Sequence, residues 1–157
     1  MGGGVACQQP NDPEAPVEPT QYTISFDSGV ESITVEEGAV ATEPTTAPEK
    51  TGYTFGGWLN GEAAYDWTQP VTSNLSLTAK WTLTQYTITY LPEGVVTDNP
   101  TTYNIESDTI TLKDPTACPS ATPNFLEWRL NGENGAVVTE IAKGSTGEVN
   151  LYAKWIE

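Results

Sequence analysis

Leu77-Thr78-Ala79-Lys80-Trp81 recurs as Leu151-Tyr152-Ala153-Lys154-Trp155, and this repeated segment decides how the rest of the chain is interpreted. Each copy closes a block that opens with the same signal, Gln21-Tyr22-Thr23-Ile24 in the first and Gln85-Tyr86-Thr87-Ile88 in the second. An internal repeat sets the number of structural units, so it is considered before any local pattern. The repeat predicts two tandem domains, at residues 21–81 and 85–157, after a tether at residues 1–20.

Both blocks have the hydrophobic period of β strands. Tyr22, Ile24 and Phe26 alternate with polar residues, and Asn60-Gly61 is a strong hairpin-turn signal. The sequence therefore predicts a mainly β fold with little helix. Tyr22 and Tyr86 are 64 residues apart, whereas Val35 and Ile105 are 70 apart, as are Trp58 and Trp128. This difference places six extra residues in the first hairpin of the second block, between Leu91 and Thr102.

Aromatic residues recur in register, which is typical of a core that is built twice. Trp67 has no such counterpart, because the aligned segment of the second block is Ala136-Val137-Val138. Tyr65 and Trp67 are therefore candidate ligand contacts, with the alternative that Trp67 covers the end of its own core. The predicted core aromatic residues are Tyr22, Phe55, Trp58, Trp81, Tyr86, Phe125, Trp128 and Trp155.

The charge of the chain is strongly acidic, with 21 acidic residues against 6 basic ones and a net charge of −15. Nucleic acids and anionic lipid surfaces attract positively charged faces, so neither is an expected partner. Solubility is one explanation of this charge, and attraction of a cationic partner or of Ca²⁺ is the alternative. No apolar run approaches the ~18 residues of a membrane-spanning helix.

The residues needed for common enzyme chemistry are missing. The chain has no histidine, which is the commonest general base and metal ligand. The sequence also lacks a phosphate-binding glycine loop, zinc-ligand spacing and a calcium-loop run of oxygen ligands. A glycosidase needs only two carboxylates, and Asp66 and Glu127 are candidates for them, so a hydrolase is the least favoured alternative. We therefore expect no enzymatic activity, no cofactor and no metal.

The tether contains one residue of special interest. Residues 1–20 are rich in proline and acidic residues and poor in apolar ones, so they cannot offset the entropy cost of folding. Val5-Ala6-Cys7 resembles the end of a bacterial lipoprotein signal, in which the cysteine carries the lipid, although the apolar stretch that normally precedes it is missing. Cys7 is thus a candidate lipidation site, with an incidental tail cysteine as the alternative.

The order Tyr-Thr-Ile-x-Phe/Tyr, Tyr-x-Phe-x-Gly-Trp and Leu-x-Ala-Lys-Trp resembles the Listeria–Bacteroides repeat, also called the internalin-type B repeat, over residues 21–81 and 85–155. The resemblance implies small β-grasp-like domains of bacterial surface proteins that act as stalks or adhesive modules. The second copy departs from the pattern at Thr122-Pro123-Asn124-Phe125-Leu126-Glu127-Trp128, which lacks the glycines. Pro123 there predicts an edge strand or a late strand start.

Taken with the resemblance, these features predict a non-catalytic stalk or spacer and adhesive contact segment on the bacterial cell surface. The expected location is extracellular, with Cys7 as the candidate lipid anchor. Expected partners are a protein or glycan of a host or neighbouring cell. The three-residue linker Thr82-Leu83-Thr84 predicts a stiff, rod-like monomer. The alternative function is a carbohydrate-binding module that uses Tyr65 and Trp67.

Overall fold

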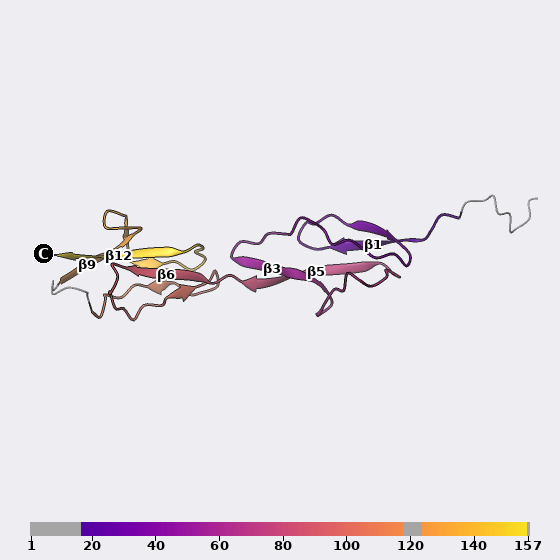
Figure 1. Ribbon diagram of the computed structural model, residues 1–157. Helices are drawn as coiled ribbons and strands as arrows, with labels where there is room; N and C mark the ends of the chain where they lie inside the picture. The colour runs from indigo at the N-terminus through magenta and orange to yellow at the C-terminus, as the bar shows by residue number, and fades with distance from the viewer. Residues whose placement is uncertain (1–16, 118–123, 157) are drawn as a thin grey trace, which may run out of the picture. The chain divides into compact units, whose positions relative to one another are not determined.

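The computed structural model describes residues 17–117 and 124–156. All regular secondary structure in these two segments is β strand, which confirms the mainly β prediction (Figure 1). The strands form two five-stranded sheets and one two-stranded sheet. The two-stranded sheet pairs β8 (Ile110–Thr111) with β11 (Glu140–Ile141).

The first sheet belongs to the first repeat copy and has the strand order β2-β1-β5-β3-β4. Its strands are β1 (Gln21–Phe26), β2 (Ile33–Glu36), β3 (Tyr53–Asn60), β4 (Ala63–Ala64) and β5 (Leu75–Leu83). β1 pairs antiparallel with β2 and parallel with β5. The expected hairpin at Asn60-Gly61 joins β3 to β4, and Gly61 has the positive φ of 66° that such a turn requires.

The second sheet has the order β10-β9-β12-β6-β7 and repeats this parallel pairing, with β6 alongside β12 (Figure 1). Its strands are β6 (Tyr86–Leu91), β7 (Thr102–Tyr103), β9 (Asn124–Leu130), β10 (Val137–Val138) and β12 (Val149–Ile156). β9 pairs with β12 throughout but with β10 only at Trp128 and Arg129. Along residues 124–127, therefore, β12 is its partner strand, whereas Pro123 lies outside the described residues.

The strand register corrects the predicted position of the extra residues in the second copy. Tyr22 pairs with Val35 in the first copy, but Tyr86 pairs with Tyr103 in the second. The counterpart of Val35 is thus Tyr103, at an offset of 68, and not Ile105. The first hairpin is four residues longer in the second copy, and the other two extra residues fall between Tyr103 and Trp128. The prediction that all six lie between Leu91 and Thr102 was wrong.

Contacts divide the described residues into two compact units. The first unit comprises residues 17–47 and 57–79, and the second comprises residues 48–56 together with 80–117 and 124–156. Residues 48–56 thus belong to the first copy in sequence but to the second unit by their contacts. The domain limits expected from the repeat, residues 21–81 and 85–157, stay a prediction.

Each unit has its own small core of side chains from its sheet and the covering loops. In the first unit, the buried apolar residues are Ile24, Ala41, Trp58, Val71 and Leu77. In the second, they are Ile88, Tyr103, Trp128, Ile141, Leu151 and Ala153. Burial of these few large side chains supplies the main stabilising free energy of domains this small.

A buried polar side chain also holds the second core together. Asn99 is buried, and its Nδ2 donates hydrogen bonds to Thr97 Oγ1 and to the backbone oxygen of Lys113, each at 2.8 Å. Its Oδ1 accepts a bond of 2.8 Å from the Lys113 amide, and Trp128 Nε1 donates to the same Lys113 oxygen at 2.9 Å. Asn99 therefore ties the longer hairpin to the segment before β9, with its polar groups satisfied.

Candidate contact site

Tyr65 and Trp67 lie in the segment after β4, within the first unit. Their rings meet edge to face, with centroids 4.7 Å apart and an interplanar angle of 89°. Trp67 also stacks on Phe26 at 6.4 Å and 17°, and Phe26 in turn contacts the buried Trp58 at 4.7 Å. Both Tyr65 and Trp67 are half-buried. The structure thus joins Trp67 to the edge of the core while leaving part of this aromatic pair exposed to solvent.

Asp66, between the two aromatic residues, is held by a local turn. Its carboxylate accepts hydrogen bonds from the Thr68 hydroxyl at 2.6 Å, the Thr68 amide at 2.9 Å and Gln69 Nε2 at 3.2 Å. These bonds, the Thr68 hydroxyl foremost, lower the pKa of Asp66 below its ordinary value. Partial burial, and secondarily the charge of Asp66, raises the pKa of Tyr65. At neutral pH the segment presents an ionised carboxylate beside a neutral phenol.

A shallow depression of about 300 Å³ lies against this turn. Its polar lining includes Asn60, Asp66 and Gln69, which can donate or accept hydrogen bonds, and Tyr65 adds an aromatic ring. The rest of the lining is largely apolar and includes Pro70 and Leu75. The β3–β4 hairpin is what brings Asn60 close to the later residues. Sequence reasoning identified Tyr65 but missed Asn60 and Gln69. The Asn60-Gly61 turn was the available signal, because it predicts that the chain folds back at this point.

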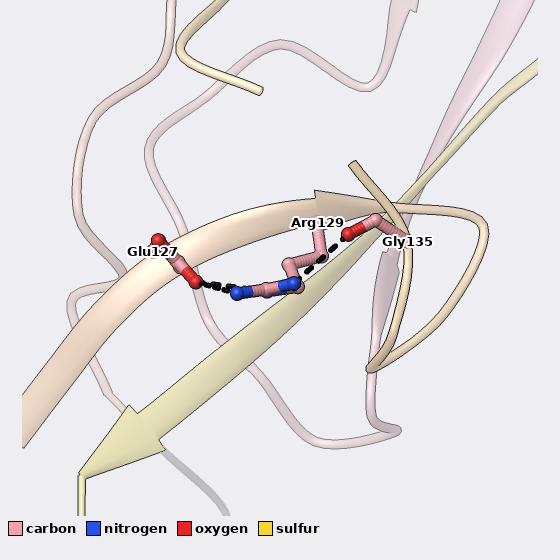
Figure 2. Close-up of polar contacts among 3 residues, drawn as sticks. All are labelled: Glu127, Arg129 and Gly135. Carbon is pink, nitrogen blue, oxygen red and sulfur yellow. Dashed lines mark hydrogen bonds and ion pairs between the residues drawn. The ribbon is translucent and has the colours of Figure 1, made fainter. Parts of the chain in front are cut away.

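A second group of charged side chains lies on β9 in the second unit. Arg129 Nε donates to Glu127 Oε1 at 2.8 Å, Nη2 also contacts this oxygen, and Nη1 donates to the Gly135 backbone oxygen at 3.1 Å (Figure 2). Lys154 pairs with Glu127 in the register, and Tyr152 pairs with Arg129. Because side chains alternate along a strand, these four lie on the sheet face opposite the buried Trp128.

Asp66 and Glu127 are the carboxylates for which a hydrolase was considered. Asp66 accepts hydrogen bonds within its own turn, and Glu127 forms an ion pair with Arg129. The two carboxylates belong to different units. Within residues 17–117 and 124–156, no group of three or more histidine, cysteine or acidic residues is arranged to hold a metal ion. The same segments contain no helix with the length and hydrophobicity of a transmembrane span.

The predicted core aromatic residues differ in exposure. Trp58 and Trp128 are each 3% exposed. The half-buried ones are Tyr22, Phe55, Trp81, Tyr86, Phe125 and Trp155. Four of these repeat one geometry, because Phe55 meets Trp81 edge to face at 5.8 Å and Phe125 meets Trp155 at 5.6 Å. Cys7, the candidate lipidation site, lies outside the described residues.

Comparisons with known proteins agree with the repeat. Internalin H of Listeria monocytogenes is 31% identical over 143 residues, which cover 85% of this chain and 25% of that protein. A protein of Evansella cellulosilytica named "Putative Gly-rich membrane protein" is 29% identical over 151 residues, which cover 88% of this chain and 16% of that protein. The chain thus spans a quarter or less of these relatives. No solved structure gives a significant match.

The family model of the Listeria-Bacteroides repeat domain matches twice, at residues 22–80 and 86–154. These ranges include both parallel strand pairs and most of the described residues. The chain belongs to the Listeria–Bacteroides repeat domain family, of which it contains two tandem copies.

Proposed function

We propose that this chain is a non-catalytic spacer segment of a bacterial surface protein. The observation that carries the proposal is the parallel pairing of the first and last long strands of each copy, β1 with β5 and β6 with β12. Because these neighbours run in the same direction, the chain enters each sheet at one end and leaves it at the other. Copies joined in series therefore increase the distance between the protein segments on either side of them.

The relatives support this role. The chain matches a quarter or less of the length of Internalin H and of the Evansella cellulosilytica protein, as expected of a repeated accessory segment. The name of the latter includes the words "membrane protein". We therefore propose an extracellular location on the bacterial cell surface, with Cys7 as the site of lipid attachment. The local engagement of Asp66 and Glu127 supports a role without catalysis.

Small-angle X-ray scattering on the chain in solution tests the spacer role. A compact globule of 157 residues would have a radius of gyration of about 15 Å. A monomeric spacer should have a clearly larger value, and the value should not change with protein concentration. A radius of gyration near that of the compact globule would contradict the proposal.

The depression beside Tyr65 favours an additional contact role. Its aromatic ring, side-chain amides and carboxylate are groups that can bind the hydroxyl groups and apolar faces of a sugar. We propose that a glycan of a host or neighbouring cell, or a surface protein that carries one, binds there through Tyr65. Trp67 then supports Tyr65 through their edge-to-face contact.

Tryptophan fluorescence tests this contact, because Trp67 lies against Tyr65 and should report a ligand bound there. A panel of glycans should include one that causes a saturable change in emission, and Tyr65→Ala should abolish that change. Tyr152→Ala is the matched control, since Tyr152 is also half-buried but lies on β12 of the second unit. The contact role would be wrong if no glycan changed the emission, or if the change survived in Tyr65→Ala.

A further inference from the structure

Two turns from different repeat copies meet within the second unit. The inserting turn, Lys50–Tyr53, is closed by a 3.0 Å hydrogen bond from the Tyr53 amide to the Lys50 oxygen, and Gly52 has a φ of 81°. The receiving turn, Asn104–Ser107, holds itself in shape. Within it, the Asn104 amide donates to Ser107 Oγ and the Glu106 amide donates to Asn104 Oδ1, each at 2.9 Å.

The inserting turn fits the receiving turn closely. A Cβ atom added to Gly52 would lie 2.6 Å from the side chain of Ile105, so only a glycine allows this approach. The Tyr53 hydroxyl donates a hydrogen bond to the Glu106 carboxylate. The contact thus combines close apolar packing of Gly52 on Ile105 with a hydrogen bond from Tyr53 to Glu106.

The linker between the copies strengthens this contact. The Thr84 amide donates a 3.0 Å hydrogen bond to the Gly52 oxygen, and the hydroxyl groups of Thr54 and Thr84 are 2.7 Å apart. The backbone of Gly52 is therefore held on one side by the linker and approached on the other by Ile105.

We infer that the receiving turn is a recognition surface for the Gly-Tyr turn of the preceding copy, and that the two copies are a matched and ordered pair. The second copy has different residues at the two positions that correspond to Gly52 and Tyr53, so it could not serve as the inserting turn. In the second copy, Thr122 and Pro123 stand where the first has Gly52 and Tyr53, at the offset of Trp58 to Trp128. Threonine adds the Cβ atom that Ile105 excludes, and proline has no hydroxyl group to donate.

The first copy has a turn at the corresponding place, Glu36–Ala39, closed by a 3.0 Å hydrogen bond from the Ala39 amide to the Glu36 oxygen, but this turn lacks the side chains of the receiving turn. Ile105 lies two residues after Tyr103, and two residues after its counterpart Val35 the first copy has the exposed Glu37, followed by Gly38. A charged residue replaces the apolar one, and no carboxylate follows it. This pairing is a property of the fold and does not depend on the spacer role.

Amide hydrogen exchange in the full chain, followed residue by residue by NMR, tests the inference. Gly52→Ala should speed exchange of the Thr84 amide about tenfold, because Cβ strain at residue 52 weakens its bond to the Gly52 oxygen. Gly38→Ala is the matched control. Gly38 has almost the same φ, 80°, but nothing lies within 4 Å of an added Cβ. Equal Thr84 exchange in the two variants would overturn the inference.

Ile105→Gly separates the approach to Ile105 from backbone strain, because it removes every obstructing atom of that side chain, the Cβ atom included. In that background, the extra effect of Gly52→Ala over Gly38→Ala should fall to the part that the positive φ of residue 52 causes by itself. An undiminished extra effect would overturn the inference. The Leu112 amide, which donates to the Thr139 oxygen, shows whether each variant remains folded.

A second measurement leaves the glycine in place. The hydrogen bond to Glu106 raises the pKa of Tyr53, so Glu106→Ala should bring that pKa back toward its ordinary value, whereas Glu37→Ala should leave it unchanged. The tyrosine ring carbon shifts measured against pH give this value in folded protein. An unchanged Tyr53 pKa in Glu106→Ala would overturn the inference, even if Gly52→Ala did not fold.

Discussion

Trp128→Ala is expected to lower the free energy of unfolding of the second unit by about 3–5 kcal/mol, because it removes the largest side chain of that core. Trp128 is 3% exposed, and its ring meets those of Tyr90 at 5.3 Å and Phe125 at 5.2 Å. Its Nε1 also donates to the Lys113 oxygen, which would lose one of its hydrogen bonds. Denaturant unfolding monitored by far-ultraviolet circular dichroism measures the change.

Leu126→Ala provides the control for this prediction. Leu126 lies on β9 two residues before Trp128, but it is 47% exposed, so its truncation should cost only about 0.5 kcal/mol. Both substitutions lie on β9 and introduce alanine, but the side chain that is removed is buried at position 128 and exposed at position 126. If both variants unfolded at the same denaturant concentration, the assignment of Trp128 to the core would fail.

The sequence was sufficient to predict the strand composition, because alternation, repeats and turn residues are local signals. Tyr22, Ile24 and Phe26 lie on β1 as the alternation indicated, and the Asn60-Gly61 turn joins β3 to β4. The duplicated Ala-Lys-Trp segments lie in the second halves of β5 and β12. These features depend on backbone preferences within a few residues of the chain.

Register within the longer hairpin could not be predicted in the same way. Val35 and Ile105 are both β-branched and end alternating segments, so the sequence alignment of the two copies placed them at the same position. The pairing of Tyr86 with Tyr103 instead depends on which side chain enters the core, and Tyr103 is buried there whereas Ile105 lies against the inserting turn. Register is set by such long-range burial, and local sequence specifies it only weakly.

The candidate contact site shows the same limit. The sequence alone left Trp67 as either a ligand contact or a cover of its own core, because an unrepeated tryptophan fits both. Its stacking on Phe26 is a contact across about forty residues of sequence, which no local pattern reveals. Asn99 was missed for a related reason. Its burial depends on the Lys113 backbone, whereas the Asn-Pro pair in the sequence indicates only a turn.

Leu77→Ala is expected to lower the free energy of unfolding of the first unit by about 2–5 kcal/mol, with the exact value set by how far the core can close over the cavity. Leu77 is 1% exposed and lies on β5 in register with Phe26 of β1. Its backbone oxygen accepts a 3.2 Å hydrogen bond from the Asp27 amide, and the Asp27 carboxylate accepts one of 2.9 Å from the Ala79 amide. The cavity would therefore form where the parallel pair is joined.

Hydrogen exchange distinguishes this local loss from a general one. The Ala79 amide should exchange faster in Leu77→Ala, because opening of the parallel pair releases its bond to Asp27. Val40→Ala is the control in the same unit, since Val40 is 52% exposed and its truncation should change stability by only about 0.5 kcal/mol. Equal unfolding midpoints for the two variants would place Leu77 outside the core. If Leu77→Ala were destabilised but its Ala79 amide still exchanged slowly, the parallel pair would remain closed without this side chain. Stability and strand direction would then depend on different residues.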